Sequence, residues 1–142
     1  ERKLLLTKII PARELEMKLI KEALKIVKEF QDKRLGDTQK ITDRLDADFY
    51  FVIKEYAEKI DSVLGNQITN DILTKTKQIE EKNAAIKEDK QTPVQAYRVG
   101  TMGRLSEMGL IRWKMASSDD GKSISKYSIL DNEMATSILK TK

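Results

Sequence analysis

Cationic side chains dominate the chemistry that this sequence offers. It contains 27 Lys and Arg against 23 Asp and Glu, and it has no His and no Cys. The commonest general base and the thiol nucleophile are therefore missing, together with the side chains that most often bind metals. We expect the chain not to be an enzyme and to need no cofactor and no metal ion.

The net charge of +4 is unevenly distributed along the chain. Residues 1–36 have 10 Lys or Arg against 6 acidic residues, residues 37–91 have 9 against 12, and residues 92–130 have 6 against 3. Neutralisation of phosphates by Lys and Arg supplies most non-specific affinity for nucleic acid. The two basic segments therefore indicate a nucleic-acid partner. The alternative is a solvated surface whose charge varies by chance.

The second basic segment begins with a well-marked helix. Thr92 and Gln95 form a Thr-x-x-Gln capping box, which predicts the helix start. Gly109 can adopt the left-handed conformation that ends a helix, and Leu110 after it can fold back on Leu105. These signals predict a helix over residues 93–108 that ends sharply.

A β-hairpin is expected directly after this helix. Asp120 and Gly121 supply the turn chemistry, and Tyr127 with Ile129 gives the returning strand an inward face. We expect Trp113 and Tyr127 to lie in the core rather than to serve as stacking platforms. The first strand is predicted from the alternation of apolar and cationic residues: Ile111, Arg112, Trp113, Lys114 and Met115.

An unusually wide apolar stripe follows Pro11, with members three and four residues apart. A helix with such a stripe needs two neighbours. Either it covers the core of its own domain, or it meets the same helix of a second subunit. In the second case the chain is a homodimer that associates through Leu15, Leu19, Ile20, Leu24, Val27 and Phe30.

Residues 37–91 and 131–142 predict further helices. Asp46 and Asp48 could suggest a metal pair, but two carboxylates ahead of an amphipathic helix more often cap it, stabilised by the helix dipole. Asp131 is expected to cap a last amphipathic helix. The remaining elements are a short helix after Asp37, a helix over 49–64 that Gly65 ends, a strand at 67–68, and a helix over 70–83 capped by Thr69.

This order of elements resembles the winged helix-turn-helix DNA-binding superfamily. Its recognition helix and first wing strand are similar to Thr92-Pro93, Arg98-Val99 and Leu105-Ser106-Glu107-Met108-Gly109-Leu110-Ile111. A weaker likeness is to the C-terminal winged-helix domain of archaeal origin-recognition initiators. The sequence departs from those initiators at Asp119-Asp120-Gly121-Lys122, where they have an Arg-Gly-Arg type of wing, and in lacking an ATPase motif.

The resemblance implies a mainly α fold, with three helices and a β-hairpin wing over residues 47–130. An N-terminal helical segment over 1–46 and a C-terminal helix over 131–142 would flank it. Helix 93–108 would lie in the major groove with Val94, Tyr97, Thr101, Leu105 and Met108 facing the core. The predicted DNA-contacting residues are Gln95, Val99, Gly100 and Gly103 at its centre, Arg98 and Arg104 at its margins, and Arg112, Lys114, Lys122 and Lys126 in the wing.

Two functions fit this expectation. The first is a double-stranded DNA-binding factor for transcription regulation or for DNA replication or plasmid maintenance, at the nucleoid in the cytoplasm or in the nucleus of a eukaryote. The second is a winged helix used as a protein-interaction module in a larger complex. No apolar run approaches the roughly 18 residues of a transmembrane helix, so no membrane role is expected. A continuous positive surface of Arg98, Arg104, Arg112, Lys114 and Lys122 would favour DNA, whereas an exposed apolar patch would favour a protein partner. A solvated role for the arginines, with the glycines serving close helix packing, is the structural alternative.

Overall fold

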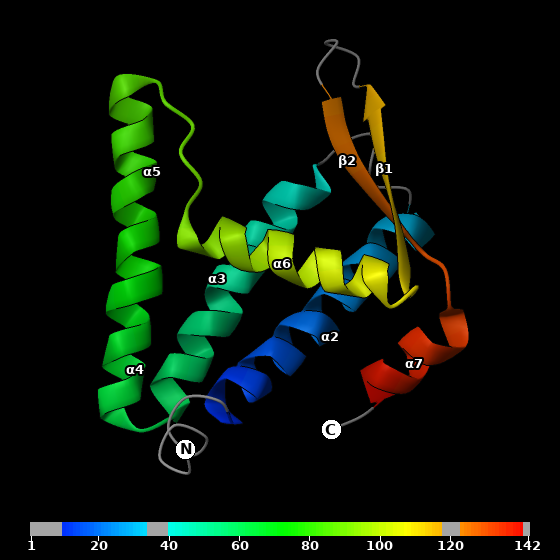
Figure 1. Cartoon of the computed structure of the whole chain (residues 1–142), viewed down its shortest axis with the longest axis horizontal. Coiled ribbons are helices and arrows are strands. Elements are labelled where there is room, and N and C mark those ends of the chain that lie inside the picture. The colour runs from blue at the N-terminus through cyan, green and yellow to red at the C-terminus, as the bar shows by residue number, and fades with distance from the viewer. Residues whose placement is uncertain (1–9, 34–39, 118–122, 141–142) are drawn as a thin grey trace.

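The computed structural model describes residues 10–33, 40–117 and 123–140 of the 142-residue chain. It is mainly helical, with one two-stranded antiparallel sheet. In Figure 1, α6 crosses α3 and α2, with α5 at one end of α6 and the hairpin at the other. The elements are α2 (Ile10–Lys33), α3 (Ile41–Lys59), α4 (Ser62–Ile68), the π-helix η3 (Thr69–Thr74), α5 (Lys75–Ile86), α6 (Pro93–Glu107), β1 (Ile111–Ser117), β2 (Ser123–Ile129) and α7 (Asn132–Lys140).

The apolar stripe of α2 is buried inside its own chain. Leu19, Leu24 and Val27 are fully buried, and they belong to one core cluster with residues of α3, α6, β1 and α7. The prediction that this stripe forms a subunit interface is wrong for the residues named, because α3, α6, β2 and α7 already cover the helix. The residues predicted to form the interface are all buried or partly buried within the chain: Leu15, Leu19, Ile20, Leu24, Val27 and Phe30.

Residues 41–59 form one continuous helix, α3, where two helices were expected. Asp46 and Asp48 therefore lie inside the helix and cap nothing. Two residues apart on a helix, they point in different directions: Asp48 accepts a 3.0 Å bond from Arg44, and Asp46 accepts one from Arg98. A metal pair at these positions is excluded by that divergence. The position predicted to divide two domains, 46/47, falls within α3.

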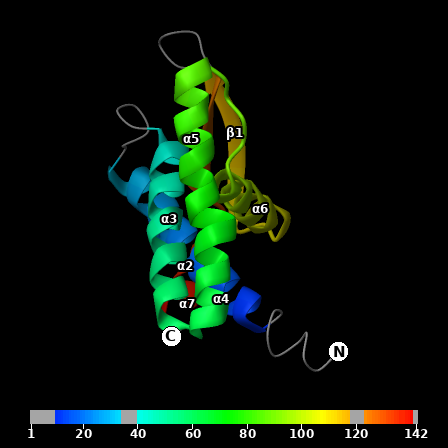
Figure 2. The ribbon, with the colours of Figure 1, turned by 90° about the vertical axis from the view of Figure 1, so that its left-hand side faces the viewer.

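The α4, η3 and α5 segments form one uninterrupted rod, which Figure 2 shows alongside α3. The strand expected at 67–68 does not exist, and Thr69 is not a cap, because its hydroxyl donates to the Gly65 carbonyl within the helix at 2.9 Å. Asp61 caps the rod instead, accepting a 2.7 Å bond from the Val63 amide. Gly65 is buried mid-helix against α3, so it permits close helix contact and does not end a helix.

The local signals around α6 are confirmed. The Thr92 hydroxyl accepts from the Gln95 amide at 3.2 Å, and the Gln95 side-chain oxygen accepts from the Thr92 amide at 2.9 Å. At the other end Gly109 has φ +74°, and the Leu110 amide donates to the Leu105 carbonyl at 3.0 Å, as in a Schellman motif. Both ends of α6 are therefore fixed by the residues that the sequence indicated.

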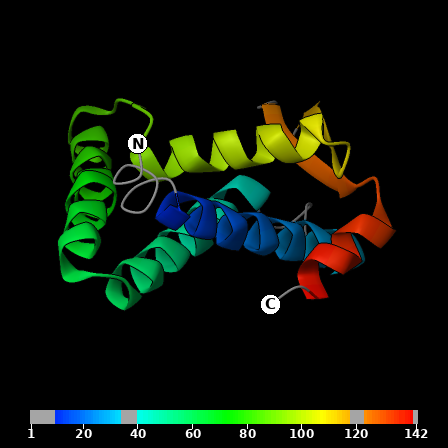
Figure 3. The ribbon, with the colours of Figure 1, turned by 60° about the horizontal axis from the view of Figure 1, so that its bottom comes forward.

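The hairpin and α7 are tied to α2. The Ile129 amide donates to the Gln31 side-chain oxygen at 3.0 Å. Asp131 caps α7 as predicted, accepting from the Met134 amide at 3.0 Å. Ala135 then buries against the core, and Figure 3 shows α7 beside α2. These contacts fix the base of the hairpin next to the C-terminal end of α6.

Candidate nucleic-acid interface

The exposed face of α6 is built from small residues. Val99 is 51% exposed, and Gly100 and Gly103 are also exposed. A Cβ added at Gly103 would meet nothing within 4 Å, and one at Gly100 would meet only an Arg104 side-chain nitrogen at 3.9 Å. Among the residues that the structure describes, these glycines therefore do not serve close packing of helices. Their effect is a flat strip on the surface of α6.

The prediction of which α6 residues face the core is correct in part. Val94, Thr101 and Leu105 are buried as expected. Tyr97 and Met108, which were assigned to the core, are exposed. Met102 is buried as well, and the prediction had not assigned it to the core side. The inner face is thus rotated toward the hairpin, because β1 packs against α6 together with α3 and α2.

Gln95 has only part of its hydrogen-bonding capacity left for a base. Its side-chain oxygen already accepts from Thr92 in the capping box. A bidentate contact to adenine needs the glutamine oxygen as acceptor and its NH₂ group as donor. The oxygen can accept a second hydrogen bond, but the capping bond fixes the amide at the start of α6, where Gln95 lines a pocket beside α3 and α5.

Arg98 was predicted to lie on an open margin of α6. It lies instead in a mostly buried ion pair. Its Nε donates to Asp46 Oδ1 at 2.6 Å, and only 16% of its side chain is exposed. Burial raises the pKa of the Asp46 carboxyl more than the Arg98 hydrogen bond lowers it. Burial also raises the pKa of the Tyr127 phenol, against the effect of hydrogen bonds with Ser125 and Arg98. Arg98 therefore joins α6 to both α3 and β2.

Replacing Arg98 with alanine should lower the free energy of unfolding by about 2 kcal/mol, because it leaves the half-buried Asp46 carboxylate without its partner. Urea unfolding measures this loss. The exposed Arg112→Ala variant is the matched control and should unfold like the wild type. A wild-type midpoint for Arg98→Ala would show that the ion pair does not contribute to the fold.

Arg104 lies on the opposite margin of α6, next to α2. It forms an ion pair with Glu16, and about half of its side chain is exposed. The carboxylate neutralises this cation locally, so it adds little to a positive surface. Arg104 also borders a groove of about 360 Å³ between α2 and α6, which Tyr97 and Gly100 line as well.

The two faces of the hairpin differ in character. Lys114 lies directly opposite Lys126, and Arg112 shares their face, opposite Ser128. Trp113 lies opposite Tyr127 on the other face, where Met115 also lies. Alternation along the strands therefore separates the cations from the aromatic residues. Lys122, predicted to contact DNA, lies outside the described residues.

Trp113 is not a core residue, contrary to the prediction. It is 51% exposed, and Met115 is exposed as well, whereas Ile111 at the hairpin base is fully buried. The reason is that the hairpin extends beyond α6 and α2 (Figure 1), so only its base reaches the core. The aromatic face turns toward α6 instead. The two elements enclose a cleft of about 320 Å³ lined by Arg98, Val99, Met102, Gly103, Ser106, Trp113, Ser125 and Tyr127.

Of the continuous positive surface expected from the sequence, the described part retains Arg112 and Lys114, because Arg98 and Arg104 are held in ion pairs. Sequence reasoning missed the link of Arg98 to Asp46, and no local signal marks a pair 52 positions apart. It also missed the cleft. A local signal for the cleft was present in β1. Trp113 and Met115 lie on the same face of this strand, and the strand extends beyond the core, so their side chains are available to line a cleft.

Comparisons with protein-family models, curated proteins and solved structures give no match. Within the described residues, no helix combines the length and apolar character that crossing a bilayer requires. The same part of the chain holds no cluster of three or more His, Cys, Asp or Glu residues suited to a metal ion.

Proposed function

We propose that this chain binds double-stranded DNA as a winged helix-turn-helix protein, with α6 in the major groove and the hairpin as the wing. The order of α3, the α4–α5 rod, α6 and the hairpin supports this reading. The capped start and sharp end of α6 also support it, because they give the helix a fixed position on the surface. A role in transcription regulation or in replication fits such a factor.

The observation that carries the proposal is the glycine strip of α6. Glycine in a helix lowers stability by about 1 kcal/mol relative to alanine. Gly100 and Gly103 each lower the stability of α6 in this way, although the described surroundings leave room for a side chain at both positions. An external surface that must approach the helix backbone closely accounts for both glycines. The edges of base pairs in a major groove are such a surface.

The hairpin supplies the charge that α6 lacks. Lys114 and Lys126 are directly opposite one another, and Arg112 shares their face. A phosphate group would lie over this cationic face. The cationic face turns away from α6, which suits a wing in a minor groove because phosphates border that groove on both sides.

The alternative function is a protein-interaction module, and the cleft between α6 and the hairpin favours it. Val99 and Trp113 are exposed on the two sides of this cleft. An exposed apolar concavity with a polar rim is typical of protein–protein contacts. In this reading an apolar side chain of a partner would occupy the space beside Trp113.

Trp113 is the single tryptophan of the chain, so its fluorescence tests the proposal directly. Titration with a short random-sequence duplex at low salt should change its emission in a saturable way, and added salt should reverse the change. If emission and the anisotropy of the labelled duplex both stay constant, DNA recognition by this chain is wrong. The cleft would then be tested as a site for a protein.

A further inference from the structure

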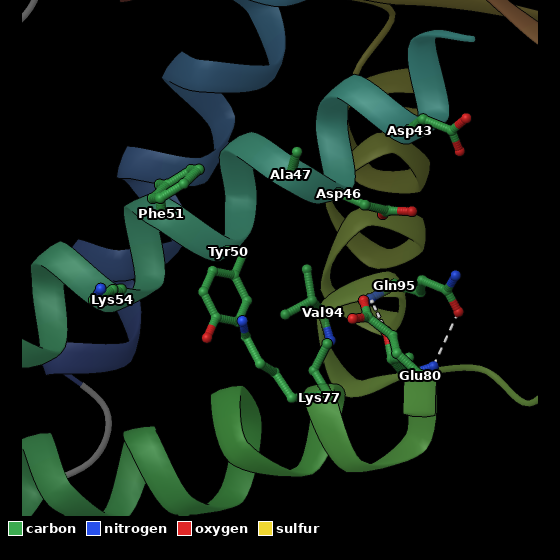
Figure 4. A pocket seen from close by; sticks show the side chains of 12 residues that line it. Asp43, Asp46, Ala47, Tyr50, Phe51, Lys54, Lys77, Glu80, Val94 and Gln95 are labelled. Carbon is green, nitrogen blue, oxygen red and sulfur yellow. Dashed lines mark hydrogen bonds between the residues drawn. The ribbon is translucent and has the colours of Figure 1, made fainter. Parts of the chain in front are cut away.

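A third hollow of the surface lies away from the hairpin, among α3, α5 and the start of α6 (Figure 4). Its volume of about 540 Å³ is within the range of small-molecule sites. Thr92, Val94 and Gln95 form the wall contributed by α6, and the Val94 amide donates to the buried Thr76 hydroxyl at 3.3 Å. Hydrogen bonds of α6 therefore hold this wall in place.

Charges of opposite sign are separated within this pocket. Figure 4 shows Asp43 and Asp46 at the end where Glu80 and Gln95 lie, and Lys54 toward the other end. Lys77 lies over the Tyr50 ring, with its Nζ 5.4 Å from the ring centroid. The antiparallel course of α3 and α5 produces this arrangement. Acidic residues come first on α3 and last on α5 within the pocket, and lysines take the opposite positions.

Grouping like charges in this way is unfavourable for the isolated chain. The pKa of Asp46 is raised mainly by burial; the ion pair with Arg98 lowers it, and the nearby charges of Asp43 and Glu80 raise it to a smaller extent. At the other end Lys54 and Lys77 are both exposed cations. Asp46 has Arg98 as its partner, whereas no ion pair among the described residues joins Asp43 or Glu80 to Lys54 or Lys77. Between the charged ends the lining is apolar or aromatic, from Ala47, Tyr50 and Val94.

We propose that this pocket binds a small dipolar molecule with an amine at one end and a carboxylate at the other. The amine meets Glu80 and Asp43 beside the Asp46–Arg98 ion pair, and the carboxylate meets Lys54 and Lys77. The apolar middle of the molecule lies along Tyr50 and Val94. This assignment concerns a small molecule, so it stands whether or not the chain binds DNA.

Helix geometry limits the length of the ligand. Lys77 and Glu80 are three residues apart on α5, which is about 4.5 Å along the helix axis. Asp46 and Lys54 are eight residues apart on α3, or about 12 Å. The two charges of the ligand are therefore separated by about 5 to 12 Å. An α-amino acid, whose charges are adjacent, is too short to reach both ends.

A series of straight-chain ω-amino acids, from glycine to 11-aminoundecanoate, tests the proposal by isothermal titration calorimetry on the full chain. Affinity should pass through a maximum at an intermediate length. The amine and the carboxylic acid of the same length should each bind about tenfold more weakly, because each meets only one end. No binding, or affinity that is flat or rises steadily with chain length, would overturn the proposal.

Three variants locate the binding. Lys77→Gln and Glu80→Gln should each weaken the best ligand about tenfold by removing one charged contact. Lys75→Gln is the matched control, because Lys75 is exposed on the same helix but does not line the pocket. All three residues are exposed, so the fold should tolerate these changes. Equal affinity in all three variants would show that the ligand binds elsewhere and would overturn the assignment.

Discussion

Replacing Gly103 with leucine should weaken binding to duplex DNA about tenfold or more while leaving the fold at least as stable. No described atom lies within 4 Å of a Cβ at this position, so the new side chain meets no internal obstacle. Leucine also favours the helix over glycine by up to about 1 kcal/mol. Against a duplex the same side chain would hold α6 away from the groove. Fluorescence anisotropy measures the affinity, and urea unfolding measures the stability.

The control for this variant is Ala84→Leu, which adds bulk at an exposed position of α5. It should leave DNA affinity unchanged, since α5 is not part of the proposed interface. Wild-type affinity in Gly103→Leu would contradict a close approach of α6 to DNA. The glycine strip would then have no role in binding.

The Gly65→Ala variant should lower the free energy of unfolding by about 3 kcal/mol, although alanine is the better helix former. A Cβ at Gly65 would clash with the Ala57 carbonyl oxygen. This oxygen belongs to the backbone of α3, so it cannot rotate away as a flexible side chain would. The helices must separate, and the rod of α4, η3 and α5 must shift with them. Thermal and urea unfolding both measure the loss.

Gly100→Ala provides the comparison for Gly65→Ala. Its Cβ would be in ordinary contact with Arg104 at 3.9 Å, so helix propensity alone decides whether the substitution raises or lowers the free energy of unfolding. We expect this variant to be more stable than the wild type by up to about 1 kcal/mol. If Gly65→Ala were stabilised to the same extent, the close contact of α3 and α4 would be wrong.

Short-range signals in the sequence predicted the parts of the fold that depend on neighbouring residues. The capping box of Thr92 and Gln95, the left-handed Gly109 and the cap at Asp131 each use residues within a few positions. The two-residue alternation of β1 likewise predicted the strand and the separation of its two faces. Local chemistry fixes such features, so a single sequence contains them.

Errors arose where one residue type serves two purposes. Glycine both ends helices and allows them to touch, and Gly65 does the second. Threonine both caps helices and bonds back to the preceding turn, and Thr69 does the second. Which role applies depends on the packing of α3 against α4, which local sequence does not contain. The continuous rod over residues 62–86 was missed for this reason.

The candidate interface depended even more on long-range contacts. The helical wheel placed Gly100 and Gly103 on the exposed face correctly, because it needs only the sequence of α6. It could not foresee that Asp46 and Glu16 would pair with Arg98 and Arg104. Because of these ion pairs, the cations available at the interface lie on the hairpin and not on α6. Arg112 and Lys114 are thus the cations on which the proposed function now depends.

The most direct test of the central claim is the salt dependence of duplex binding in the double variant of Arg112→Ala and Lys114→Ala. Loss of two phosphate contacts should flatten the plot of log affinity against log salt by about 1.8, and affinity at low salt should fall. The double variant of Lys25→Ala and Lys28→Ala removes the same charge from the exposed face of α2 and should keep the wild-type slope. Equal slopes in the wild type and both variants would contradict a DNA-binding wing.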